Sequence, residues 1–154
     1  MLTLNVRDTR QRYSEVNRMA LLGLEVVTKV SNQDSAAVSH INKEYLDYLL
    51  NNCVSFTSHY VQDEEIGGFT VVCDTLDFYG EGETLVEAID ELVASTCDYL
   101  NLFKEDPELY AKFNTVGKNI ALLKLLRCQS EEEVRRAMCV DATTIYPRRH
   151  SENA

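Results

Sequence analysis

The stretch GEGETLVEAIDEL, residues 80–92, indicates the start of a long helix. Thr84 and Glu87 have the spacing of a capping box, in which each side chain accepts a hydrogen bond from the other residue's backbone amide. From Leu85 to Phe103, apolar residues recur at the spacing of one helix face. Because Pro107 cannot lie inside a helix, we expect about five helical turns that end before it.

Two segments with alternating polarity precede this helix. Apolar or aromatic residues alternate with polar ones in residues 54–60 and again in residues 69–73. This alternation is typical of strands with one buried face. The acidic segment 62–65 and the glycine pair 67–68 separate them, so the sequence predicts a β-hairpin with an acidic turn. Gly80 and Gly82 are interpreted as turn residues before the helix.

The first fifty residues predict a strand, a helix, a hairpin and a second helix. Leu2, Leu4 and Val6 alternate with polar residues, as in a half-buried strand. Asp8 or Thr9 is expected to cap the first helix. The remaining expected segments are strands at 25–31 and 36–41, a turn at 32–35 and a helix at 43–50.

The last fifty residues predict further helices. Asp106 and Pro107 form an N-cap followed by proline at the first helical position, and Ser130 and Glu133 have capping-box spacing. Residues 141–154 have no apolar pattern, so a mobile tail is expected.

Together these patterns predict an α+β fold. The expected divisions are a strand-helix-hairpin-helix domain at 1–52, a β-hairpin with a long helix at 53–105, a helical region at 106–140 and a mobile tail at 141–154.

The charge distribution favours a basic protein partner. The net charge is −10, and it lies entirely in residues 51–154, because residues 1–50 carry six basic and six acidic side chains. An acidic body repels nucleic acid and attracts basic proteins. Any contact with DNA is therefore expected in the arginine-bearing segment 7–18.

Cysteine spacing and hydropathy place the chain in the cytoplasm. The five cysteines form no C-x-x-C pair, and their number is odd, which argues against disulfide staples and structural zinc. The first residues lack a basic segment followed by an apolar one, so no signal peptide is expected. The apolar stretch 120–126 is too short to span a bilayer.

The sequence does not favour an enzyme. Cys73 and His59 face each other in the predicted hairpin and are the strongest nucleophile–base pair. The carboxylates Asp74, Asp77, Glu81 and Glu83 could bind a metal ion, although acidic residues beside glycine turns are commonly just solvated. Phosphate-cradling glycine motifs are absent. We therefore expect no catalytic residues, no metal and no cofactor.

Three segments resemble bacterial type II antitoxins. Residues 1–50 are similar to the Phd/YefM-type domain, whose short last helix ends in E-Y-x-x-L, and Lys43-Glu44-Tyr45-Leu46-Asp47-Tyr48-Leu49 matches that ending. Residues 56–93 resemble the HicB-type fold, a small sheet crossed by one long helix, and the segments 64–71 and 80–89 carry this resemblance. The P-G-C/F element of that fold is present only as Phe78-Tyr79-Gly80. The segments 109–110, 122–126 and 131–134 resemble a RelB-like C-terminal region.

The resemblance implies an antitoxin that neutralises a small, basic RelE/ParE-like toxin by covering its active surface. Apolar side chains entering grooves of the toxin would supply most of the affinity. The toxin-binding candidates are Tyr110, Phe113, Leu122, Leu125 and Leu126. The competing interpretation is that all five belong to the hydrophobic core.

The resemblance also implies a homodimer that represses its own operon. The DNA-binding candidates are Arg7, Arg10, Arg12 and Arg18. The family's hairpin turn is commonly basic or glycine-rich and approaches DNA, whereas Asn32-Gln33-Asp34-Ser35 carries no cation, which weighs against DNA contact there. The alternative function is a binding or sensory module of the same fold that has no cognate toxin.

Overall fold

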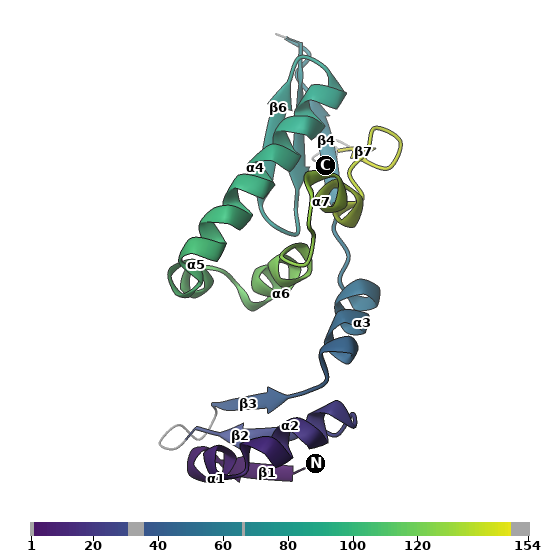
Figure 1. Ribbon diagram of the computed structural model, residues 1–154. Helices are drawn as coiled ribbons and strands as arrows, with labels where there is room; N and C mark the ends of the chain where they lie inside the picture. The colour runs from purple at the N-terminus through teal and green to yellow at the C-terminus, as the bar shows by residue number, and fades with distance from the viewer. Residues whose placement is uncertain (1, 31–35, 66, 149–154) are drawn as a thin grey trace, which may run out of the picture. The chain divides into compact units, whose positions relative to one another are not determined.

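The protein consists of two compact units, Met1–Leu49 and Leu50–Ala154 (Figure 1). The structure, a computed structural model, describes residues 2–30, 36–65 and 67–148. The predicted turn at 32–35 therefore lies outside the described residues, as does the end of the predicted tail.

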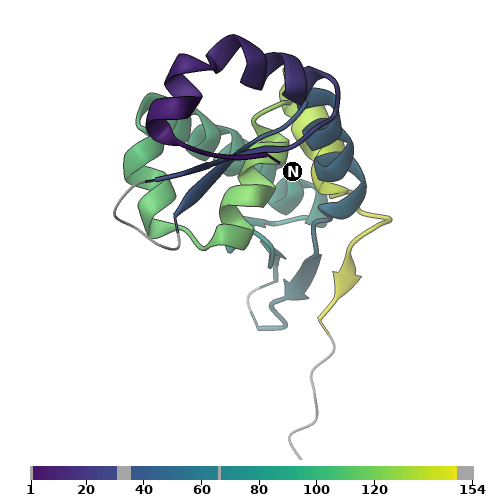
Figure 2. The same cartoon turned by 90° about the horizontal axis from the view of Figure 1, so that it is seen from below.

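The first unit contains a three-stranded sheet with two helices over it. The chain runs through β1 (Leu2–Asn5), α1 (Val6–Gln11), α2 (Tyr13–Leu21), β2 (Val26–Lys29) and β3 (Ala37–His40). The strand order is β1-β2-β3, with β1 parallel and β3 antiparallel to β2. Figure 2 shows α1 and α2 lying over the strands. The buried apolar centre consists of Leu4, Val16 and Val26.

The first helix begins earlier than the sequence predicts. The Asn5 side chain caps α1 by accepting a hydrogen bond of 2.8 Å from the Asp8 amide, so Val6 is helical and the prediction of Asp8 or Thr9 as the cap is wrong. Thr9 lies inside the helix, where its hydroxyl is 2.8 Å from the Thr28 hydroxyl in the interior. This buried contact outweighs the local preference of threonine for a cap.

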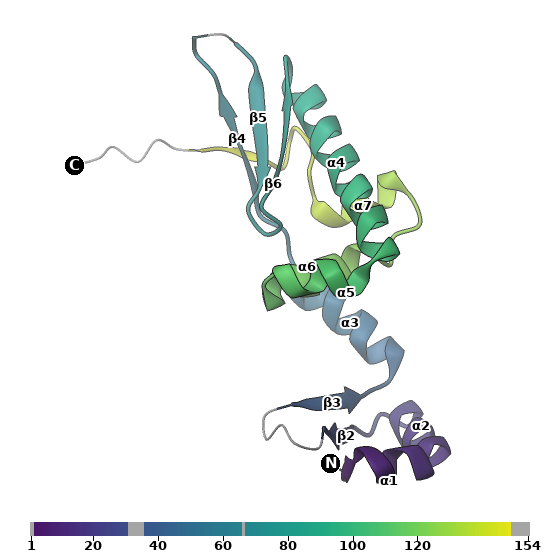
Figure 3. The same cartoon turned by 90° about the vertical axis from the view of Figure 1, so that its left-hand side faces the viewer.

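The second unit contains a four-stranded sheet covered by helices. Helix α3 (Lys43–Cys53) belongs to the first unit up to Leu49 and to the second from Leu50. It leads into β4 (Ser58–Gln62), β5 (Phe69–Cys73) and β6 (Phe78–Gly82). The strand order is β6-β5-β4-β7, where β7 is Tyr146–Pro147. The remaining helices are α4 (Leu85–Glu105), α5 (Pro107–Phe113), α6 (Val116–Leu125) and α7 (Glu131–Met138). Figure 3 shows α4 lying along one face of the sheet.

Strand β6 is absent from the sequence-based expectation, which has turn glycines at this place. Gly80 and Gly82 lie within the strand, where α4 crosses it closely. A Cβ atom at Gly80 would lie 2.2 Å from the Leu92 nitrogen, and one at Gly82 would lie 2.5 Å from the Ala88 nitrogen. The glycines therefore permit contact between two backbones, a role that glycine in a strand often has.

The predicted helix starts of the second unit are confirmed. The Thr84 hydroxyl accepts from the Glu87 amide at 3.2 Å, and the Glu87 carboxylate accepts from the Thr84 amide at 3.0 Å, so the capping box is complete. The Asp106 side chain caps α5 by accepting from the Leu109 amide at 3.1 Å. Ser130 caps α7, although the Glu133 carboxylate there accepts from the Gln129 amide instead of closing the box.

Residues 141–148 differ from the mobile tail that the sequence predicts. Val140 and Ile145 are buried in the core of the second unit. The Arg148 amide donates to the Tyr60 carbonyl at 2.9 Å, beside the pairing of β7 with β4. Asp141 accepts hydrogen bonds from the Thr143 amide and hydroxyl, which lower the pKa of its carboxyl group. The polar turn at 141–144 thus brings Ile145 back to the core. One apolar residue is too short a pattern for hydrophobic periodicity to reveal.

The protein has two compact units, whereas the sequence predicts four divisions. Residues 53–148 share one hydrophobic core, in which residues of the sheet and α4 pack with residues of α6 and α7. Within the described part of the chain, no helix combines the length and hydropathy that a bilayer crossing requires.

Candidate protein-interaction surfaces

The predicted toxin-binding residues lie in three different environments. Leu122 and Leu125 are fully buried in the core of the second unit, as the competing interpretation expects, so their side chains are not exposed to a partner in this fold. Tyr110 is half-buried, with its ring centroid 5.5 Å from that of Tyr99, and Leu126 is also half-buried. Of the five residues, Phe113 is the one that is exposed, at 82%.

The outer sides of α5 and α6 carry exposed apolar residues, and sequence reasoning selected only Phe113 among them. Leu109 and Phe113 are four residues apart on α5, and Val116, Ile120 and Leu123 follow helical spacing on α6. All five are exposed, with Val116 at 76%. These residues are called the α5–α6 apolar surface below. Because α6 has apolar residues on both sides, its sequence alone does not show which side is buried.

Side-chain hydrogen bonds fix the corner between α5 and α6. The Tyr99 hydroxyl donates to the Asn114 amide oxygen at 3.2 Å, and the Asn114 amide nitrogen donates to Asn119 at 3.1 Å. Asn119 in turn donates to the Ala111 carbonyl at 3.0 Å, and Thr115 caps α6. This network determines where Phe113 and Val116, on either side of the corner, are presented.

The candidate DNA-binding arginines are exposed, but they are not equivalent. The guanidinium group of Arg12 donates two hydrogen bonds of 2.8 Å to Glu15. This interaction raises the pKa of Arg12 and lowers that of Glu15. The side chains of Arg7 and Arg10 on α1 make no hydrogen bond or ion pair with another described residue. Arg18 is exposed near the end of α2.

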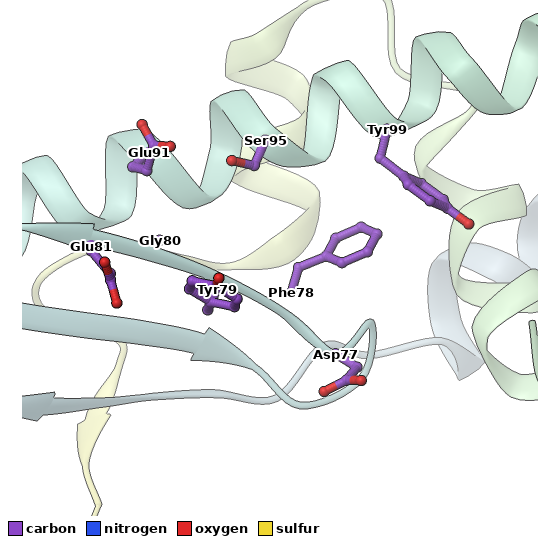
Figure 4. A pocket seen from close by; sticks show the side chains of 8 residues that line it. All are labelled: Asp77, Phe78, Tyr79, Gly80, Glu81, Glu91, Ser95 and Tyr99. Atoms are coloured by element: carbon purple, nitrogen blue, oxygen red, sulfur yellow. The ribbon is translucent and has the colours of Figure 1, made fainter.

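A hollow of about 640 Å³ lies between β6 and α4 (Figure 4). Asp77, Tyr79 and Glu81 line it from the strand side, and Glu91 and Ser95 line it from α4. The rings of Phe78 and Tyr99 form one end, where their centroids are 4.8 Å apart. A second hollow, of about 410 Å³, shares Glu81 and is also lined by Asp63 and Glu83. The residues lining both hollows include acids and no lysine, arginine or histidine.

The suggested catalytic pair is not assembled. Cys73 is paired with Ser58 in the strand register, and burial raises the pKa of its thiol, which disfavours the reactive thiolate. The Nδ1 atom of His59 is instead 2.9 Å from the Asp74 carboxylate. The described residues contain no group of three or more potential metal ligands, whether from the carboxylates named above or from other residues.

Comparisons with known proteins identify the family of this chain. A family model described as the Phd-like antitoxin of a RelE/RelB toxin–antitoxin system matches residues 1–140. The chain belongs to this antitoxin family, and it functions as an antitoxin. No curated protein sequence gives a significant match.

A solved structure shares the fold. It is a protein of Syntrophomonas wolfei subsp. wolfei, described as the antitoxin part of a proposed toxin–antitoxin system, and it superposes with a TM-score of 0.60. The alignment covers 89% of this chain and 96% of that chain at 18% identity. At 18% identity, the similarity shows only that the two proteins share a fold.

Proposed function

We propose that this antitoxin neutralises a small, basic RelE/ParE-like toxin by direct binding through the α5–α6 apolar surface. The single observation that carries this proposal is the exposure of Phe113 and Val116 beside a well-packed core. Large apolar side chains in that position are the usual anchors of a protein interface. In this view α5–α7 form the RelB-like region, and β4–α4 form the HicB-like one.

The charge of the chain supports a basic partner. The net charge of −10 comes from residues 51–154. Helices α5 and α6 themselves carry one acidic and three basic side chains, so the acidic groups that would attract the toxin lie on other parts of this segment. Opposite charges accelerate the encounter of two proteins and orient them, while apolar anchors supply most of the affinity.

Co-purification from the native bacterium tests the proposed function. The full chain is isolated at low salt, and proteins bound at stoichiometric amounts are identified by mass spectrometry. We expect a small basic protein that arrests growth when it is expressed alone and is harmless when it is co-expressed with this chain. If the chain purifies without a partner, this result would contradict neutralisation by direct binding and favour a sensory module.

The first unit is proposed to be a Phd/YefM-like dimerisation domain, because its own core is very small. Three buried apolar residues form the centre of this unit, whereas Tyr13, Leu21, Leu22 and Leu24 are exposed. A unit of this size buries too little apolar surface to be stable without additional contacts. A second copy that covers these residues would supply the missing burial.

Light scattering after size exclusion measures this association. We expect the full chain to elute as a dimer, and we expect the double variant Leu21→Glu/Leu24→Glu to elute as a monomer, since a buried unpaired carboxylate is costly. Val86→Glu, which changes an exposed apolar residue on α4, serves as the matched control and should remain dimeric. A wild-type monomer at micromolar concentration would contradict the proposal.

Operator binding by the dimer is the second proposed function, supported by the free guanidinium groups of Arg7 and Arg10 on α1. Binding of the full chain to a DNA fragment carrying its own promoter is measured at several salt concentrations. Arg7→Ala and Arg10→Ala should each weaken binding and lower the slope of log K against log salt by roughly one. Arg12→Ala is the control, because the Arg12 guanidinium group is already paired with Glu15. This variant should have a smaller effect on DNA binding. Equal effects at all three positions would argue against specific contacts by α1.

A further inference from the structure

Strand β6 forms one edge of the sheet in the second unit. The strand order is β6-β5-β4-β7, and β6 pairs with β5 in the register Val71–Gly80 and Val72–Tyr79. Within the described part of the chain, no strand pairs with its other side. An edge strand exposes backbone amides and carbonyls that can bind another extended chain.

The hydrogen bonds of the neighbouring strands show which backbone groups of β6 are free. The Asp74 amide donates to the Thr57 carbonyl at 2.8 Å, and the Asp63 amide donates to the Gly68 carbonyl at 3.1 Å. Because backbone groups alternate sides along a strand, the even-numbered residues of β5 bond to β4 and the odd-numbered ones bond to β6. Their partners in β6 are Phe78, Gly80 and Gly82. The amides and carbonyls of Tyr79 and Glu81 therefore point toward the open edge.

This open edge borders the hollows described above. The hollow of about 640 Å³ runs from Asp77 to Glu81 beside the strand and is flanked by Glu91 of α4 (Figure 4). The second hollow continues from Glu81 to Glu83. Asp77, Glu81 and Glu91 form no ion pair with a described residue. Lys118 is a cation at one end of the hollow, where its Nζ atom lies 4.5 Å from the centroid of the Phe78 ring. The edge thus combines free hydrogen-bonding groups, space and carboxylates that have no ion-pair partner among the described residues.

Among the described residues, β6 lacks the lysine and proline residues that often protect an edge strand from pairing. Natural edge strands are commonly protected by lysine, proline, a bulge or a covering segment. Strand β6 contains neither lysine nor proline, and Tyr79 is 63% exposed. Pairing with β6 of a second copy would bring the acidic side chains of both strands together, which is unfavourable. The charge therefore disfavours self-association and favours a basic strand.

We propose that β6 binds an extended basic segment of the toxin, which adds to the sheet as a further strand. The backbone groups of Tyr79 and Glu81 would hydrogen-bond to it, in the manner of β-strand addition. Asp77, Glu81 and Glu91 would pair with its lysine or arginine side chains, and the Tyr79 ring would contact their aliphatic parts or their charge. This inference rests on the proposed direct binding of a basic toxin, and it adds a second contact to the α5–α6 apolar surface.

Hydrogen exchange of the full chain tests this contact without any substitution. The probe is the growth-arresting protein that co-purifies with the chain. Exchange at the amides of Tyr79 and Glu81 is compared between the free chain and the complex. We expect both amides to be strongly protected in the complex and to exchange rapidly in the free chain at all concentrations.

Two variants at one position separate the backbone contribution from the charge. Glu81→Thr removes the carboxylate but keeps the amide, whereas Glu81→Pro removes both, and proline is tolerated where an edge amide faces outward. We expect Glu81→Thr to weaken toxin binding by about threefold and Glu81→Pro by more than about tenfold. Circular dichroism confirms the fold of each variant, and the exchange measurement remains decisive if Glu81→Pro does not fold.

The outcomes distinguish this inference from the proposed function. A complex in which the amides of Tyr79 and Glu81 exchange as in the free chain would overturn the strand addition while leaving toxin binding intact. Protection of these amides in the free chain that increases with concentration would identify a second copy as the occupant and would also overturn it. Failure to obtain any complex would overturn the proposed function together with this inference.

Discussion

Replacing Gly80 with alanine should destabilise the second unit by about 3 kcal/mol, the upper part of the range for overpacked cores. The added Cβ would lie 2.2 Å from the Leu92 nitrogen and 2.4 Å from the Ala88 carbonyl oxygen. Both atoms belong to the backbone of α4, so no side-chain rotation can relieve the clash. The helix would have to move away from β6, which would open the core around Ala88 and Leu92.

Urea denaturation followed by far-ultraviolet circular dichroism measures this effect. Gly117→Ala is the matched control, because a Cβ at this position in α6 meets no atom within 4 Å. Alanine also favours helix over glycine, so this variant should be unchanged or slightly more stable, by up to about 1 kcal/mol. If Gly80→Ala and Gly117→Ala unfold at the same urea concentration, this result would contradict the close contact between the backbones of β6 and α4.

Replacing Phe113 with alanine should abolish most of the neutralising activity while leaving the fold intact. The side chain is 82% exposed, so its removal costs little core packing. A central aromatic anchor of an interface typically contributes 2 kcal/mol or more, which corresponds to a loss of roughly 30-fold in toxin affinity. The measurement is titration of the purified toxin with wild-type and variant chains, together with growth of cells that co-express the two proteins.

Two further variants distinguish a binding effect from a folding effect. Tyr146→Ala removes a similarly exposed aromatic residue from β7, away from the α5–α6 apolar surface, and it should neutralise normally. Leu122→Ala should instead destabilise the fold by about 2–5 kcal/mol, because this side chain is fully buried. Normal affinity of Phe113→Ala for the toxin would exclude Phe113 as an anchor.

Some features of the interaction surfaces could be predicted from sequence, whereas others could not. The acidic character of the second unit and the exposed arginines of α1 follow from composition and from their helical positions. The sequence does not show which of Leu122 and Leu123 is buried. Both belong to an apolar stretch, so either side of α6 could face the core. Packing of α6 into the core of the second unit buries Leu122 and leaves Leu123 exposed.

The sequence by itself determined the elements whose signals are local. The capping box of Thr84 and Glu87 and the cap at Asp106 require hydrogen bonds between residues three apart, so they can be recognised before the fold is known. The antitoxin family was likewise recognisable from the order of short motifs, and the match over residues 1–140 confirms it.

Only the tertiary structure decided the features that depend on residues far apart in the chain. Gly80 and Gly82 look like turn residues locally, yet they lie in strand β6 because this segment pairs with β5. Glycine is needed at both positions because α4 approaches the strand too closely for any side chain. Ile145 joins the core because β7 pairs with β4, more than eighty positions earlier in the chain. Burial and strand pairing depend on contacts between segments that are distant in the chain. A local sequence pattern does not show which distant segment will pack or pair with it.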